Sequence, residues 1–213
     1  MHHVHAPSDP LSIALEHNAW ATRELLQSCA ALDDEQWHRR FEMGLGSLHD
    51  TLTHVVGAMF RWADRIDGPP RTVRPSIEDG SRRTPAELMA LLDRAASELA
   101  ASAERARARG LETVLDVTLA GQVYRFTLGA MLVHVTTHGM HHRAQCLNML
   151  RRLAVPGISD RLPEIAAHSS TSISGSRSLM PGTASRRSMF RHCARWCIPC
   201  VVTCTSIAPR VNR

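Results

Sequence analysis

The sequence predicts an all-α protein, a four-helix bundle with one long crossover connection. Three observations support this prediction. Four long segments repeat apolar residues at helical spacing, their starts carry capping residues, and an alternating strand pattern occurs only near residue 120. The chain has 213 residues, of which 44% are apolar and 21% are charged. These values suit one domain of ordinary size with an appendage.

The first half of the chain is expected to form two long helices and a short one between them. Asp9 is an N-cap acid followed by proline, and apolar residues then recur at helical spacing up to Leu32. A short helical turn is expected over residues 33–37. Ser47, with an acid three residues later, begins the second long helix, which ends before Gly68.

The second half is expected to form two further helices and a hairpin. A loop rich in proline and arginine leads to Thr84, where the run Thr-Pro-Ala-Glu is the strongest cap of the chain. The third long helix extends from there to Gly110. Residues 113–126 alternate with period two, which favours a short hairpin. Thr127 then caps the fourth helix, which extends through Leu153.

The composition divides the chain into three parts. We expect a flexible N-terminus over residues 1–9, the bundle over residues 10–160, and an irregular tail over residues 161–213. The tail is expected to be disordered or the product of a shifted reading frame. It has no acidic residue after Glu164, and four cysteines fall within twelve residues: Cys193, Cys197, Cys200 and Cys204. Four such thiols can hold zinc or an iron–sulfur cluster, but we expect no functional metal site in this segment.

The charge pattern narrows the partners. All 25 basic residues are arginine; 18 of them against 20 acids precede Ile165, a balance of −2, and the other seven follow it, which gives the total of +5. Because the bundle is mildly acidic, we expect no nucleic-acid partner. No apolar run approaches the roughly 18–20 residues of a membrane span, and no secretory signal is visible. Cys29 and Cys146 lie on apolar helical faces, which favours a reducing cytoplasm.

Histidines interrupt the apolar face of the fourth helix. The segment LVHVTTHGMHHRAQ holds four of them, at positions 134, 138, 141 and 142. The apolar stripe from Met131 through Val135 to Cys146 includes positions 138 and 142, so two core-facing residues are His138 and His142. Residues four apart on a helix lie one above the other, and their imidazoles can converge on one point.

Three interpretations of these two histidines are open: metal ligands, a hydrogen-bonded buried pair, or exposed side chains. A metal ion satisfies both buried rings at once and is therefore the leading interpretation. A site of this kind needs a third protein ligand. His54, beside the apolar stripe of the second long helix, is the best-placed candidate, and His17 and His49 are weaker ones.

Several short motifs resemble the DinB/YfiT-like family of metalloenzymes. They are HNxW over residues 17–20, LHDTLTH over residues 48–54 with Trp62 beyond it, and HxxxHRxQ over residues 138–145. The resemblance covers roughly residues 10–155 and implies an up–down–down–up four-helix bundle that is often a homodimer. It also implies a divalent ion, Zn²⁺, Ni²⁺ or similar, on three histidines, which by motif are His54, His138 and His142. Some members use low-molecular-weight thiols as S-transferases or isomerases.

The expected activity is that of a metal-dependent transferase or hydrolase acting on a small-molecule substrate. Three histidines leave open coordination positions, as in catalytic metal sites. A hydrolase needs a base near the metal, for which His141 and Asp50 are candidates. The alternative is a non-catalytic bundle that the metal staples together. We expect Arg143 to pair with an acid on a neighbouring helix, Gln145 to orient a ligand histidine, and Cys146 to belong to the core.

Overall fold

The structure is a computed structural model that describes residues 9–68, 74–119 and 121–156. The predicted tail and its four cysteines lie outside these residues. The described chain forms, in order, α1 (Pro10–Cys29), α2 (Asp34–His38), α3 (Leu48–Asp67), α4 (Pro85–Arg109), β1 (Val114–Leu119), β2 (Gln122–Thr127) and α5 (Leu128–Arg152). The all-α prediction and the hairpin before the last helix are confirmed.

Each long helix begins at the residue that the sequence predicts. The side chains of Asp9, Ser47, Thr84 and Thr127 each accept a hydrogen bond from a backbone N–H in the first turn that follows. At Thr84 the bond is reciprocal, because Glu87 also accepts the backbone N–H of Thr84. A cap of this kind stabilises a helix by about 1 kcal/mol and fixes where it starts. The starts in turn set which residues of α3 and α5 face inward.

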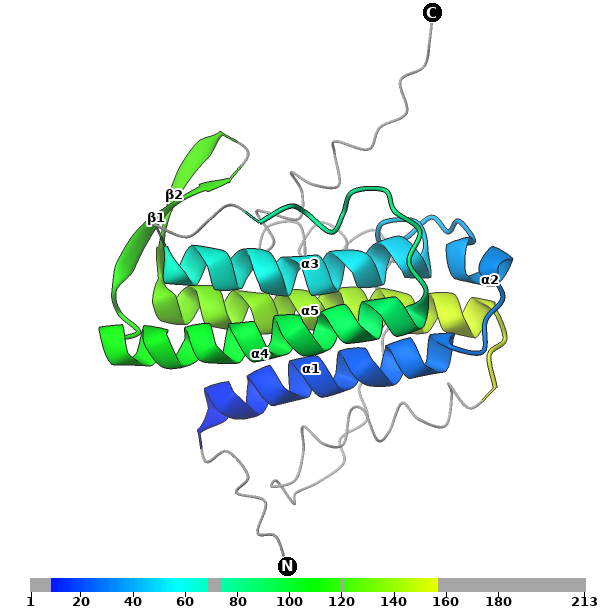
Figure 1. Cartoon of the computed structure of the whole chain (residues 1–213), viewed down its shortest axis with the longest axis horizontal. Helices are drawn as coiled ribbons and strands as arrows, with labels where there is room; N and C mark the ends of the chain where they lie inside the picture. Colours follow the sequence, from blue (N-terminus) through cyan, green and yellow to red (C-terminus); the bar gives the residue numbers. More distant parts are fainter. Residues whose placement is uncertain (1–8, 69–73, 120, 157–213) are drawn as a thin grey trace, which may run out of the picture. The chain divides into compact units, whose positions relative to one another are not determined.

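The four long helices pack around a shared core (Figure 1). α3 lies against α4 and α5, and α1 lies against the same two helices. Each long helix contributes fully buried apolar side chains, for example Leu25, Leu52, Leu92 and Met131. On α3 every residue from 51 to 60 is buried. The side of α3 that α4 and α5 leave open is covered by α2 and by the loop that follows α3. Polar residues in this stretch of α3 therefore face protein rather than water.

That loop, residues 74–84, is called the strap here, and it returns along α3 before α4 begins. Arg74 at its start donates a hydrogen bond to Asp64, near the end of α3. At its far end, the backbone N–H of Arg83 donates to the His49 ring, near the start of α3. The crossover predicted between the second and third long helices is therefore present. The up–down–down–up order of helix directions stays a prediction.

The two strands pair as a hairpin that turns at Gly121, whose φ of +78° favours glycine. The tip of the hairpin, Thr118–Val123, is separate from the compact unit that the helices form. None of the described helices is both long enough and apolar enough to cross a membrane.

Candidate metal centre

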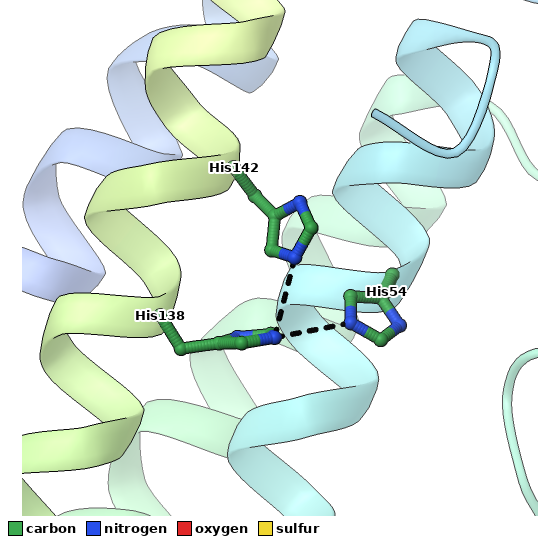
Figure 2. A group of neighbouring side chains, drawn as sticks. All are labelled: His54, His138 and His142. Atoms are coloured by element: carbon green, nitrogen blue, oxygen red, sulfur yellow. Dashed lines mark hydrogen bonds between the residues drawn. The ribbon is translucent and has the colours of Figure 1, made fainter. Parts of the chain in front are cut away.

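Three buried histidines meet between α3 and α5 (Figure 2). The Nε2 atoms of His54 and His142 each lie 3.2 Å from Nε2 of His138. One ring nitrogen from each residue lies within 4.8 Å of the other two. Within the described ranges, no second group of three His, Cys, Asp or Glu residues converges in this way. The structure thus brings together the three residues that the sequence analysis selects.

In two of these rings the outer nitrogen, Nδ1, which is not the one that faces the other histidines, contacts an oxygen acceptor. His54 Nδ1 lies 2.8 Å from Oε2 of Glu78, and His142 Nδ1 lies 2.8 Å from Oε1 of Gln145. The Gln145 amide is oriented by its nitrogen, which lies 3.0 Å from Nε2 of His141. Oxygen acceptors at both Nδ1 atoms assign the ring protons there, so that Nε2 of each ring carries the lone pair. Both lone pairs are directed toward His138.

The surroundings keep the Glu78 carboxylate ionised and the rings of His138 and His142 neutral. Burial alone would raise the pKa of Glu78, but the hydrogen bond from His54 and the charge of Arg61 bring that pKa below its ordinary value. Burial lowers the pKa of His142 to about 3, and the nearby His54 adds to this effect. Burial, followed by the neighbouring His142 and His54 rings, also depresses the pKa of His138 far below its usual range. At neutral pH the inner rings of α5 are therefore uncharged.

The donor set fits a divalent cation. Nε2 of His138 carries at most one proton and can donate it to only one of its two neighbours, so the lone pair of the other neighbour would face a nitrogen that donates nothing to it. A cation among the three nitrogens removes this conflict. Neutral imidazole nitrogens are ligands that Zn²⁺ and Ni²⁺ prefer in proteins. The site therefore has the chemistry, the burial and the outer support of a three-histidine metal centre.

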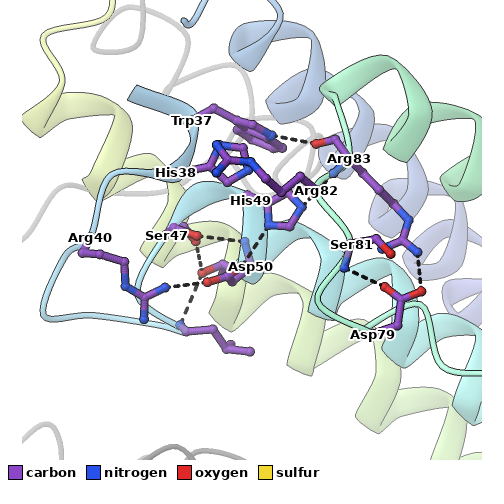
Figure 3. A network of polar contacts seen from close by, with 12 residues as sticks. Trp37, His38, Arg40, Ser47, His49, Asp50, Asp79, Ser81, Arg82 and Arg83 are labelled. Atoms are coloured by element: carbon purple, nitrogen blue, oxygen red, sulfur yellow. Dashed lines mark hydrogen bonds and ion pairs between the residues drawn. The ribbon is translucent and has the colours of Figure 1, made fainter. Parts of the chain in front are cut away.

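The weaker third-ligand candidates lie elsewhere. His49 is buried, but its Nδ1 lies 2.8 Å from Oδ1 of Asp50, and its Nε2 accepts the backbone N–H of Arg83 at 3.1 Å (Figure 3). His17 belongs to α1, where its ring packs 5.6 Å from that of Trp20. Neither belongs to the convergent group. Asp50, an expected candidate base, is instead tied to His49 and to Arg40.

The expectation for Arg143 was wrong in its partner. The guanidinium is buried, as an ion pair would require, but it donates to the side chain and backbone oxygens of Asn18 on α1. The reason is that α1 places an amide at this point instead of a carboxylate. Gly139 makes room for the contact, since a Cβ there would lie 2.2 Å from Asn18 Oδ1. Arg143 therefore joins α1 to α5 through neutral acceptors.

Gln145 and Cys146 lie where the sequence predicts them, one beside a convergent histidine and the other in the core. Gln145 contacts the outer nitrogen of His142, the position from which it orients that ring. Cys146 is fully buried, and its burial raises the pKa of the thiol to about 12. A thiol that stays protonated in an apolar environment is a core residue rather than a metal ligand.

The sequence analysis missed Glu78. This residue lies in the strap, 24 positions after His54, in a loop with no hydrophobic period that could place its side chain. The only signal was an acid within a segment rich in proline and arginine, and many surface loops share that composition.

The two other histidines of α5 lie at the edge of the site. The His134 ring is 5.5 Å from that of His138, and the His141 ring is 5.2 Å from that of His142.

Comparison with known proteins finds one family whose model covers these helices. A model of the DinB family matches residues 8–167, which is well over half of the chain. The matched range contains all three convergent histidines and the strap. A search of curated proteins finds no match.

Proposed function

The chain belongs to the DinB family, and from this membership we propose that it is a metal-dependent enzyme whose three histidines hold one divalent cation. The ligands would be the Nε2 atoms of His54, His138 and His142. The observation that carries this proposal is their convergence, with the outer nitrogens of two rings held by oxygen acceptors. Three buried rings in this arrangement are better explained by a cation than by hydrogen bonds alone.

The ligand set also favours catalysis over a purely structural role. Three neutral nitrogens leave the charge of a divalent cation uncompensated, and they leave at least one coordination position open. Among the described residues, no thiolate or carboxylate joins the convergent group. A cation so held lowers the pKa of bound water to about 7 or stabilises a thiolate. The proposed reaction is therefore hydrolysis of a small molecule, or transfer of a low-molecular-weight thiol to one.

A homodimer and a cytoplasmic location are part of the same proposal. The dimer is implied by the family resemblance of the helical motifs. The location is supported by Cys29 and Cys146, the two cysteines of the bundle, which are buried and form no disulfide. The competing function is a bundle that the metal only staples together. In that case the cation would have no position open to an added ligand.

The first experiment measures metal content. The full-length chain is purified without a histidine tag and analysed by elemental mass spectrometry, together with a variant carrying His138→Ala and His142→Ala. We expect near-stoichiometric metal in the parent and almost none in the variant. A parent that stays empty after incubation with Zn²⁺, Ni²⁺ or Mn²⁺ would contradict the proposal.

A second measurement separates enzyme from staple. The parent is loaded with Co²⁺, and its visible spectrum is recorded before and after addition of a small thiol. A new sulfur-to-cobalt charge-transfer band would support the thiol-transfer reaction. A change of the d–d bands with pH, without any response to thiol, would support a metal-bound water and hydrolysis. A spectrum that responds to neither would favour the staple.

A further inference from the structure

We infer that Glu78 is a positioning residue of the metal centre. The strap places its carboxylate against Nδ1 of His54, and Gly57 leaves room for that carboxylate beside α3. The inference rests on the proposed metal site and deepens it. It assigns a role to a loop residue that lies outside the convergent histidines. It also assigns a reason for a glycine in the middle of a long helix.

Glu78 makes two contacts that fix its carboxylate in place. One oxygen, Oε2, lies 2.8 Å from Nδ1 of His54, and the other, Oε1, accepts from the guanidinium of Arg61. The His54 side chain is 4% exposed and that of Glu78 is 26% exposed, so the bond between them is largely shielded from water. Because both oxygens are engaged, the carboxylate cannot rotate away from the ring without losing a partner.

The strap is anchored on both sides of Glu78. On the near side, the backbone N–H of Glu78 donates to the hydroxyl of Ser76 at 3.0 Å. On the far side, Arg83 donates to the Ile77 carbonyl at 2.6 Å and to Asp79 at 2.9 Å, and its backbone N–H donates to His49. The bonds within the strap fix its shape, and the bonds from Arg83 to His49 and from Arg74 to Asp64 attach it to α3 independently of the His54 contact. The carboxylate is therefore presented to the ring by a structured segment.

Gly57 lies one helical turn after His54, on the part of α3 that the strap covers. A Cβ at this position would lie 2.8 Å from Oε1 of Glu78, 3.0 Å from the Arg61 guanidinium and 3.3 Å from Ile77. A glycine within a helix is less favourable than alanine, so its presence calls for a packing reason. Here the reason is the close approach of the Glu78 carboxylate to the helix.

The consequence concerns the ligand atom of His54. An acceptor at Nδ1 keeps the ring proton there, so Nε2 carries the lone pair, and it holds the plane of the ring toward His138. Without Glu78 the ring can rotate and exchange tautomers, and the three nitrogens are no longer preorganised. Partners of this kind typically change metal affinity by about 10–100-fold.

The test compares Zn²⁺ affinities of full-length variants, measured by competition with a chromophoric chelator. Glu78→Ala is expected to weaken binding by about 10–100-fold. Glu78→Gln keeps an oxygen acceptor and is expected to recover part of that loss. The matched control is Asp79→Ala, which removes the neighbouring strap carboxylate that holds Arg83 and Ser81 but touches none of the three histidines. It is expected to change affinity by less than about twofold.

Gly57→Ala separates positioning from stability. The atoms that its Cβ would displace are the ends of flexible side chains, and alanine favours the helix. We therefore expect weaker Zn²⁺ binding together with an unchanged or higher Tm of the metal-free protein. The control is Gly129→Ala on α5, where a Cβ would meet Leu111 at an ordinary 3.4 Å. It should leave the Zn²⁺ affinity unchanged.

The outcomes distinguish this inference from the proposed function. If the parent binds Zn²⁺ and Glu78→Ala binds it equally well, the role of Glu78 is overturned while the metal site stands. Equal losses in Asp79→Ala and Glu78→Ala would also overturn it, because strap attachment alone would then control affinity. If the parent binds no metal, the proposed function fails and this inference fails with it.

Discussion

Two buried histidines on the same helix, His49 and His54, differ in one atom's surroundings. Both are almost fully buried, and the Nδ1 of each lies 2.8 Å from a carboxylate oxygen, of Asp50 and Glu78 respectively. Their Nε2 atoms face different groups. That of His49 accepts a backbone N–H (Figure 3), whereas that of His54 faces the Nε2 of His138 (Figure 2). Burial and a carboxylate partner thus do not separate the proposed metal ligand, His54, from His49; the two differ in the group that the second nitrogen faces.

The difference arises from where along α3 each residue lies. His49 is in the first turn, where α2 and the end of the strap supply neighbours: its ring packs edge-on to Trp37 at 5.7 Å and accepts from Arg83. A buried backbone N–H needs an acceptor, so this nitrogen is committed. His54 is more than one turn further along, opposite the middle of α5, where the facing groups are side chains. A nitrogen among other ring nitrogens is available to a cation.

The largest expected effect comes from exchanging these two histidines for alanine one at a time. His54→Ala removes a ligand and should weaken Zn²⁺ binding by more than about 100-fold, beyond the loss typical of an outer partner. His49→Ala should leave the Zn²⁺ affinity within about twofold. It should instead lower the free energy of unfolding by about 1–3 kcal/mol, because the Arg83 N–H loses its buried acceptor.

Chelator competition and urea unfolding of the metal-free variants measure the two effects separately. If His49→Ala lost Zn²⁺ binding at unchanged stability, the group that faces Nε2 would not be what separates His49 from His54.

The part of the site that sequence could predict is the part that one helix encodes. His138 and His142 share a face because they are four residues apart on a helix whose cap at Thr127 is also visible in the sequence. Periodicity placed His54 beside the apolar stripe, and the family motif selected it. The local sequence does not show that Nε2 of His49 has a partner elsewhere, because its donor is the backbone N–H of Arg83, 34 residues away.

Loops explain the remaining gap between sequence and structure. Glu78 reaches His54 only because the strap returns along α3, and neither its course nor its register follows a periodic pattern. Arg143 shows a related limit. A partner on a neighbouring helix was predicted, but its identity depends on which residue α1 presents, and that residue is Asn18.

His142 in the convergent group and Asp50 beside His49 should also respond to acid in different pH ranges. The folded-state pKa of His142 is about 3, below its ordinary 6.5, so between these values the unfolded chain binds a proton that the folded chain does not. Stability of the metal-free protein should therefore fall as the pH drops below 6.5, by about 2 kcal/mol at pH 5 from His142 alone. The hydrogen bond from His49 lowers the pKa of Asp50 to about 2, so the stability it contributes is lost only below about 3.8.

Urea unfolding of the metal-free protein at a series of pH values measures this difference. His142→Asn removes the titrating ring, so its free energy of unfolding should fall less than that of the parent between pH 6.5 and pH 5. Parallel pH profiles for the two proteins would contradict the assignment of this range to the convergent histidines.

The smallest effect is expected at the other outer partner, Gln145. Its amide oxygen supports Nδ1 of His142 as Glu78 supports that of His54, but an amide is neutral, and it lies on the same helix as the ring that it supports. Gln145→Ala should weaken Zn²⁺ binding by about tenfold, or about 1.4 kcal/mol, the low end of the range for such partners. His141→Ala is the comparison variant: it removes the contact that orients the Gln145 amide but leaves the amide oxygen in place, so it should weaken binding less than Gln145→Ala does. If His141→Ala weakened Zn²⁺ binding as much as Gln145→Ala does, the Gln145 oxygen would support His142 only while His141 holds the amide in place. The contrast between Gln145 on the helix and Glu78 in the strap would then not explain the difference in affinity.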